Sequence, residues 1–186
     1  MFTQPIAGRR CLVIGYGDLG QAAVRAGKRL GLEVVAVSRT GVGDGPADRL
    51  VPVARIDAEL PQAEFVIVAA PLTPETHHLI GRARLALLPP DAGLVNVGRA
   101  PLVDVAALVE LLRAGRLAGA ILDVHDAEPL PSDSALWDVP NLIVTPHISC
   151  DDPRYADMLL DAWAANLERF LAGMPLRNVV DRARGY

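Results

Sequence analysis

The stretch Arg10-Cys11-Leu12-Val13-Ile14-Gly15-Tyr16-Gly17-Asp18-Leu19-Gly20 decides the fold of this chain. A short apolar run typical of a buried strand enters the pattern GxGxxG, and an alanine-rich stretch typical of a helix follows it. Gly15 would allow a tight turn, Gly17 the close approach of a diphosphate, and Gly20 close packing of helix on strand. Residues 33–37 (EVVAV) supply a second strand and complete a βαβ unit. The context favours a dinucleotide site over the alternative, a glycine-rich structural turn.

The expected contacts of this loop include Asp18 and Leu19, which lie between the last two glycines. The phosphates would sit at the N-terminus of the helix, where backbone N–H groups and the helix dipole attract anions. A carboxylate so close to a diphosphate would repel it. We therefore expect Asp18 to point to solvent or to serve the helix N-terminus, where negative charge is favourable.

The residues after the second strand bear on which nicotinamide cofactor binds. An acidic side chain there would accept hydrogen bonds from a ribose 2′-hydroxyl, whereas an arginine would pair with a 2′-phosphate. The chain has Ser38-Arg39-Thr40 at this point, and Glu33 lies at the wrong end of the strand to replace the missing carboxylate. The sequence thus favours NADP (as NADPH), with NAD as the alternative. Arg39 as a solvated surface charge is the competing interpretation.

Strand-like and helix-like segments alternate almost to the end of the chain. This alternation predicts right-handed crossovers and an α/β fold: a Rossmann-type, doubly wound parallel sheet in three layers, with helices on both faces. Further strands are expected at 65–69, 93–97, 118–124 and 142–145, and helices at 82–88, 103–114 and 153–172. We assign residues 1–176 to a dinucleotide-binding domain and residues 177–186 to a polar tail.

Three polar side chains follow apolar runs in the second half of the chain: Arg99, Glu128 and His147. Open parallel sheets bind ligands outside the carboxyl ends of their strands, so the three are expected to converge there. Together they could bind the carboxylate of a 2-oxo acid, stabilise a charged imidazole and pass a proton to a carbonyl oxygen. That is reduction chemistry, which requires a hydride donor. Taken singly, each could instead be a surface ion-pair partner, a loop carboxylate or a histidine satisfied at a strand end.

Composition excludes several other classes of function. Of the 186 residues, 51% are hydrophobic and 4% aromatic, which suits a Val/Leu/Ala-rich α/β core. The net charge of −4 offers no basic surface for nucleic acid or an anionic membrane, and no apolar run is long enough to span a bilayer. The N-terminus lacks a signal-peptide core, and two cysteines make no disulfide framework, so we expect a cytoplasmic protein. The scattered histidines predict no metal site. These are His77, His78, His125 and His147, of which His77 and His78 are expected to face solvent and His125 matches no demanded role.

Five motifs in order resemble the D-isomer-specific 2-hydroxyacid dehydrogenases over nearly the whole chain. They are GYGDLG (15–20), PLTPET (71–76), NVGR (96–99), LDV with EP (122–124 and 128–129) and TPH (145–147). The resemblance implies that Arg99 binds the substrate carboxylate and carbonyl, that His147 is the acid/base, and that Glu128 pairs with it. Asp123 would face the nicotinamide carboxamide. Further implied cofactor contacts are Pro71, Thr76 and Val97.

The resemblance also narrows the branch of the family. The Ser38-Arg39-Thr40 turn is similar to that of the NADPH-preferring glyoxylate and hydroxypyruvate reductases, whereas the phosphoglycerate dehydrogenase branch usually has an aspartate there. Glu128 argues against the formate dehydrogenases, which carry a glutamine at that position. A small 2-oxo or 2-hydroxy acid is thus the expected substrate.

Family members also have a second, substrate-binding domain, most of which we expect to be absent from this chain. A truncated or isolated cofactor domain is one interpretation, and a naturally short protein is the other. Cys150 with Asp151-Asp152 replaces the small segment that usually follows the histidine, which changes the expected shape of the substrate pocket. The resemblance implies a homodimer formed through the cofactor domain. A cofactor-sensing interaction module, like the family's corepressor relatives, and a dimerisation scaffold remain alternatives, although the intact Arg99, Glu128 and His147 set favours an enzyme.

Overall fold

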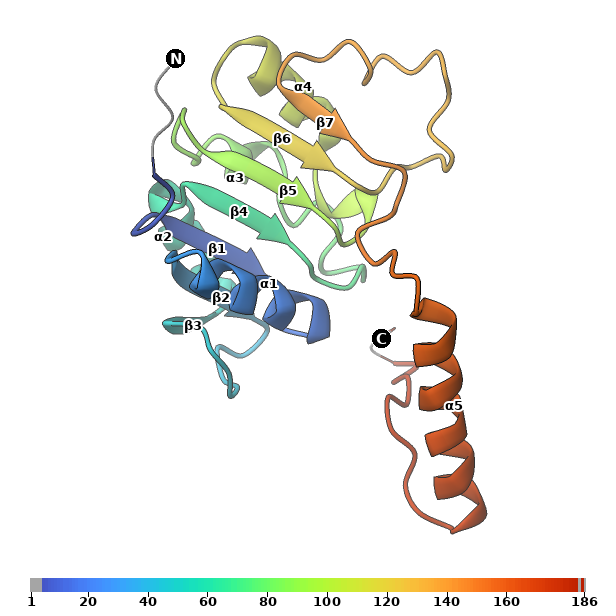
Figure 1. The fold of residues 1–186 in the computed structure, drawn as a ribbon. Helices are drawn as coiled ribbons and strands as arrows, with labels where there is room; N and C mark the ends of the chain where they lie inside the picture. The colour runs from blue at the N-terminus through green and yellow to red at the C-terminus, as the bar shows by residue number, and fades with distance from the viewer. Residues whose placement is uncertain (1–4, 184, 186) are drawn as a thin grey trace. The chain divides into compact units, whose positions relative to one another are not determined.

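The computed structural model describes residues 5–183 and 185, and its chain divides into two compact units, residues 1–147 and 148–186. The first unit is built on a seven-stranded sheet with the order β3-β2-β1-β4-β5-β6-β7, in which each neighbouring pair is parallel (Figure 1). The strands are β1 (Arg10–Ile14), β2 (Glu33–Ser38), β3 (Arg49–Pro52), β4 (Phe65–Val68), β5 (Gly93–Asn96), β6 (Gly119–Leu122) and β7 (Leu142–Val144).

Helices connect these strands and cover the two faces of the sheet. The α-helices of this unit are α1 (Asp18–Arg29), α2 (Ile56–Glu59), α3 (Arg82–Leu85) and α4 (Val105–Arg113), and the 3₁₀ helices are η1 (Val53–Arg55), η2 (Leu60–Gln62) and η3 (Ala100–Leu102). Strands β2 and β3 are added on one side of β1 and the later strands on the other, so the switch point of the strand order, where ligands of such sheets bind, lies between β1 and β4.

The side chains of β1 illustrate how the sheet separates two apolar layers. Leu12 and Ile14 belong to the larger layer, which includes residues of α2, α3 and α4. Cys11 and Val13 point to the other face and pack with Val24 of α1. Successive side chains of a strand face opposite sides of a sheet, so a strand buried on both faces is apolar at every position.

The second unit contains one long helix, α5 (Tyr155–Leu171), none of whose residues is buried. Its large apolar side chains are all exposed: Tyr155, Met158, Leu159, Leu160, Trp163, Leu167, Phe170 and Leu171. Among the residues that the structure describes, no helix has the length and apolar character needed to cross a membrane.

The predicted fold class is confirmed, with helices on both faces of a parallel sheet. The prediction missed β3, because four residues that end in a proline carry little strand signal and this strand pairs only with β2 at the sheet edge. The helix expected at 82–88 is α-helical only to Leu85, because Leu87 and Leu88 then donate tighter i→i−3 bonds to Arg84 and Leu85 before the two prolines at 89 and 90. The other expected elements are present, with ends that differ by at most two residues. The domain boundary at residue 176 stays a prediction.

Candidate active site at the carboxyl edge of the sheet

The loops that carry the predicted site residues share one edge of the sheet. Because the seven strands run in one direction, the segments that follow β1, β2, β4, β5, β6 and β7 all begin at their carboxyl ends (Figure 1). These segments hold the glycine loop, the Ser38 turn, the loop at 71–76, Arg99, Asp123 with Glu128, and His147.

The glycine loop has the backbone shape that a dinucleotide requires. Gly15 has φ +100°, and an added Cβ would lie 2.6 Å from the carbonyl oxygen of Ala69. A Cβ on Gly20 would lie 1.9 Å from the carbonyl oxygen of Gly15, so α1 packs directly on the turn. At Gly17, by contrast, a Cβ would meet no atom within 4 Å. Open space therefore lies before the first turn of α1, which has no side-chain cap and whose first residue, Asp18, is exposed. This arrangement fits a diphosphate bound by backbone N–H groups.

The turn after β2 presents an arginine to solvent. The Ser38 hydroxyl accepts a hydrogen bond from the Gly41 N–H at 2.9 Å, which shapes the turn around exposed Arg39 and Thr40. Glu33, the carboxylate at the start of β2, pairs with Arg10 at 2.9 Å instead. Within the described residues Arg39 has no ion-pair partner, and its guanidinium is open to an anionic ligand.

Thr76 braces the loop after β4. Its hydroxyl donates to the Pro71 carbonyl at 2.8 Å and accepts from the Thr73 N–H at 2.7 Å. The loop is thus held in one shape by its own side chain. These hydrogen bonds explain the shape of the loop. The implied contacts of Pro71 and Thr76 with a cofactor stay predictions.

Arg99 stands on a turn that a buried asparagine organises. The Asn96 amide donates to the Arg99 carbonyl at 3.0 Å and accepts from the Gly98 N–H at 3.1 Å, while Val97 donates from its backbone to Val68 of β4 at 3.0 Å. Asn96 is fully buried and Arg99 is exposed, with its guanidinium 2.7 Å from the Gly98 carbonyl. The sequence pattern included Asn96 in a motif but gave it no role. A buried amide at the end of a strand is the signal that would have indicated one.

Of the three predicted catalytic residues, Glu128 and His147 contact each other in the structure. His147 Nδ1 lies 2.8 Å from Glu128 Oε2, and both side chains are about one-third exposed, at 35% and 37%. The hydrogen bond from His147 lowers the pKa of the Glu128 carboxyl, and the His125 backbone N–H lowers it further. An ionised carboxylate can only accept, so Nδ1 donates and Nε2 is the ring nitrogen left to exchange a proton.

Asp123 and His125 are buried side chains that hydrogen-bond Thr145, two residues before His147. The buried Asp123 carboxylate accepts a hydrogen bond from the Thr145 hydroxyl at 2.5 Å, which ties the end of β6 to the end of β7. His125 is buried as well and hydrogen-bonds the Thr145 carbonyl at 2.9 Å, although the sequence pattern assigned it no role. The strong polarity of histidine masked its burial, because polar side chains at strand ends usually face solvent.

The remaining predicted features are peripheral to this site. His77 and His78 are exposed as expected, and their ring centroids lie 4.2 Å apart with the planes tilted by 32°. Across residues 5–183 and 185, no group of three His, Cys, Asp or Glu side chains has the arrangement that could hold a metal ion.

Comparison with known proteins agrees with the motifs. Residues 1–149 match the family model described as D-isomer specific 2-hydroxyacid dehydrogenase, NAD binding domain. A glycerate dehydrogenase from Methylorubrum extorquens is 38% identical over 95% of this chain and 54% of its own length. The chain spans about half the length of the curated relatives that it matches.

Two solved structures extend the comparison. A D-isomer specific 2-hydroxyacid dehydrogenase from Xanthobacter autotrophicus, in complex with NADPH and MES, is 41% identical with a TM-score of 0.89, covering 100% of this chain and 76% of that one. An NADPH-dependent glyoxylate/hydroxypyruvate reductase from Sinorhizobium meliloti, in complex with NADP and sulfate, is 32% identical with a TM-score of 0.90, covering 100% of this chain and 60% of that one.

Proposed function

The chain belongs to the D-isomer-specific 2-hydroxyacid dehydrogenase family, as an NAD(P)-binding domain, and from this membership we propose that it serves the NADPH-dependent reduction of a small 2-oxo acid. The observation that carries the proposal is the Glu128–His147 contact of 2.8 Å at the carboxyl edge of the sheet. A histidine oriented by an ionised carboxylate is the arrangement that general acid/base chemistry at a carbonyl requires.

Each catalytic residue has a distinct part in the proposed reaction. Nicotinamide, when bound in its reduced form, supplies the hydride that reaches the carbonyl carbon. Protonated His147 donates from Nε2 to the carbonyl oxygen, while Glu128 holds Nδ1 and stabilises the imidazolium. Arg99, exposed at the same edge, binds the substrate carboxylate through its planar guanidinium and orients the carbonyl. The product is the 2-hydroxy acid.

The cofactor contacts in this proposal follow from the loops of the edge. Backbone N–H groups at Gly17, Asp18 and Leu19 bind the diphosphate, and Gly15 and Gly20 permit the turn. Asp123 would face the nicotinamide carboxamide, and Pro71, Thr76 and Val97 would also contact the cofactor, as the resemblance implies. The preference for NADPH over NADH rests on Arg39, supported by the hydroxyls of Ser38 and Thr40 and by the absence of a carboxylate from residues 38–40.

The organisation of the whole protein is part of the proposal. We assign residues 1–176 to the cofactor domain and residues 177–186 to a tail toward a substrate domain, as the resemblance implies. A homodimer is supported by the exposed apolar side chains of α5, which a monomer would leave in water. The free thiols of Cys11 and Cys150 support a reducing, cytoplasmic location.

Two measurements test the proposed function. Calorimetric titration of this chain with NADPH and with NADH should give clearly tighter binding of NADPH. Turnover is measured in a chimaera that carries this chain in place of the matching segment of the Sinorhizobium meliloti reductase, with glyoxylate and hydroxypyruvate as substrates. A chimaera that binds NADPH yet reduces neither acid would contradict the proposed activity, and a chain that prefers NADH would overturn the cofactor preference alone.

A further inference from the structure

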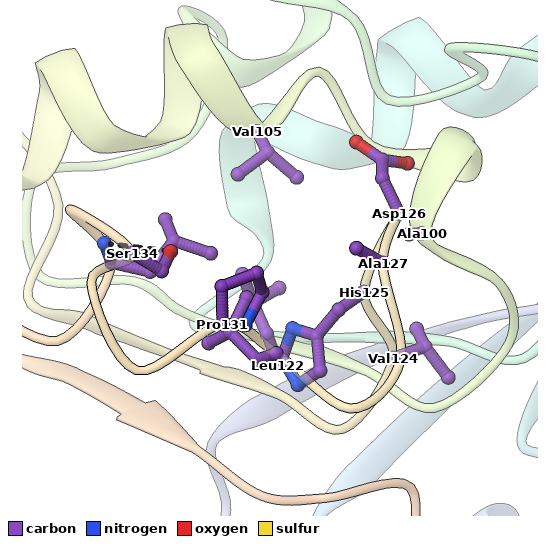
Figure 2. A pocket seen from close by; sticks show the side chains of 11 residues that line it. Ala100, Val105, Leu122, Val124, His125, Asp126, Ala127, Pro131 and Ser134 are labelled. Atoms are coloured by element: carbon purple, nitrogen blue, oxygen red, sulfur yellow. Dashed lines mark hydrogen bonds between the residues drawn. The ribbon is translucent and has the colours of Figure 1, made fainter.

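His125 occupies an unusual position for a histidine. It follows β6, has 9% of its surface exposed, and lines a cavity of about 240 Å³ (Figure 2). Apolar side chains of Val124, Leu130 and Pro131 make up much of the surrounding wall. A buried imidazole costs free energy unless its nitrogens find partners, so the contacts that it makes are informative.

The ring of His125 binds the chain segment that leads to His147. Nε2 lies 2.9 Å from the carbonyl oxygen of Thr145, two residues before His147. A carbonyl can only accept, so Nε2 carries the proton and the neutral ring is the Nε2–H tautomer. Nδ1 is then an acceptor, and within the described residues it is buried without a hydrogen-bond partner, on the Pro131 side of the ring (Figure 2).

The backbone of the same residue binds the other half of the catalytic pair. The His125 N–H donates to Glu128 Oε1 at 2.9 Å, and Glu128 Oε2 accepts from His147 Nδ1 at 2.8 Å. One residue therefore contacts Glu128 through its main chain and, through its side chain, the backbone of Thr145, two residues before His147. His147 has φ +57°, a left-handed backbone that is unfavourable for a histidine and needs support from its surroundings.

We propose that His125 is a positioning residue, whose Nε2–H···O=C bond to Thr145 fixes the segment of His147 and so aligns the Glu128–His147 pair. The inference rests on the proposed function of that pair. The contact is specific to one tautomer, because only the Nε2–H form can donate to the Thr145 carbonyl. A proton on Nδ1 instead would leave the Thr145 carbonyl without its donor.

The first test needs no substitution. Long-range ¹H–¹⁵N spectra of the wild-type chain distinguish the two neutral tautomers of each histidine. The expected result is the Nε2–H form for His125. The Nδ1–H form would overturn the proposal.

The second test separates positioning from packing. His125→Phe keeps a flat ring in the cavity but removes the donor, whereas His125→Gln places an amide N–H where Nε2 lies. The titration midpoint of the Glu128 carboxyl, followed by carbon NMR in this chain, should rise in His125→Phe toward its value in His147→Ala and stay near wild type in His125→Gln. NADPH affinity should be unchanged in both His125 variants. In the chimaera, His125→Phe should lower kcat about fivefold, the worth of one hydrogen bond, with little change in KM.

The outcomes also distinguish this proposal from the proposed function. If His147→Ala raises the Glu128 midpoint and His125→Phe does not, the positioning role is wrong and the catalytic pair stands. If His147→Ala leaves the midpoint unmoved, Glu128 and His147 are not coupled, and the proposed catalytic pair fails together with the inference.

Discussion

His147 Nδ1 donates to Glu128 Oε2 at 2.8 Å, and this contact joins the segments after β7 and β6 across 19 positions of sequence. The two side chains approach each other because β6 and β7 are neighbouring parallel strands, with Leu122 paired to Val144. A hydrogen bond from the Thr145 hydroxyl to Asp123 ties the same two strand ends together. The register of the sheet thus brings the two segments together, and local contacts such as the bond from the His125 N–H to Glu128 then place the side chains.

Substitution of His147 should lower turnover more than substitution of Glu128. In the chimaera, His147→Ala should reduce kcat by about 10²- to 10⁴-fold, the usual worth of general acid/base catalysis. Glu128→Gln keeps the shape and removes the charge, and a charged hydrogen bond of about 1.5–3 kcal/mol corresponds to a fall of about 10- to 100-fold. Steady-state kinetics with glyoxylate measure both. Near wild-type turnover in His147→Ala would exclude the proposed role of His147.

The lowered pKa of Glu128 predicts how the pair responds to acid. A carboxyl whose pKa is lower in the folded chain stabilises that chain above its unfolded pKa, and the contribution is lost as pH falls through the folded value. The wild-type chain should therefore lose stability on acidification through this range more steeply than Glu128→Gln. Thermal melts at a series of pH values measure the difference. Parallel curves of melting temperature against pH for the two chains would show that the Glu128 carboxylate contributes nothing to the stability of the fold.

The glycine loop offers a matched pair of substitutions. Gly15→Ala combines φ +100° with a Cβ 2.6 Å from backbone atoms, so it should lower the free energy of unfolding by about 1–3 kcal/mol and the melting temperature by several degrees. Gly17 has φ −79° and open space around its Cβ, so Gly17→Ala should leave the melting temperature unchanged. Its methyl group would stand where the diphosphate approaches and should weaken NADPH binding about tenfold or more. Equal melting temperatures for the two variants would contradict the geometry.

The fold was largely predictable from the sequence because a strand buried on both faces is apolar throughout. Strand β2 has an unbroken apolar run, which indicates a central strand: Val34, Val35, Ala36 and Val37. The GxGxxG pattern identifies the turn that follows β1. Edge strand β3 has no such signal, since only Val51 of its four residues is buried. The local pattern cannot reveal a strand that depends on its neighbour for pairing.

The exposed catalytic residues of the site could be predicted from the sequence, but the buried residues that hold them in place could not. Arg99, Glu128 and His147 are polar residues after apolar runs, a contrast that stands out in the sequence. Asn96 and His125 owe their importance to burial and to hydrogen bonds with backbone atoms, and these are properties of the packed structure. No spacing in the sequence encodes them.

Arg39 should determine the choice of cofactor. Arg39→Ser removes charge-assisted hydrogen bonds of about 1.5–3 kcal/mol, so NADPH binding should weaken about 10- to 100-fold. NADH binding should not change, because it lacks the 2′-phosphate. Arg113→Ser, in the last turn of α4, is the control for the loss of one exposed positive charge. Calorimetry of the three chains with both nucleotides measures the effect, and equal losses in the two variants would indicate a general charge effect rather than recognition.

The two cysteines should differ in reactivity. Burial raises the pKa of the Cys11 thiol to about 11, and its side chain is 1% exposed inside β1, whereas Cys150 is exposed. Thiolate is the reactive form, and at pH 8 a thiol with that pKa is about one-thousandth ionised. Iodoacetamide should therefore label Cys150 in the native chain and leave Cys11 unmodified, as read by peptide mass spectrometry. Denaturant should make both react. Labelling of Cys11 at the rate of Cys150 without denaturant would show that β1 opens far more readily than a central, fully buried strand should.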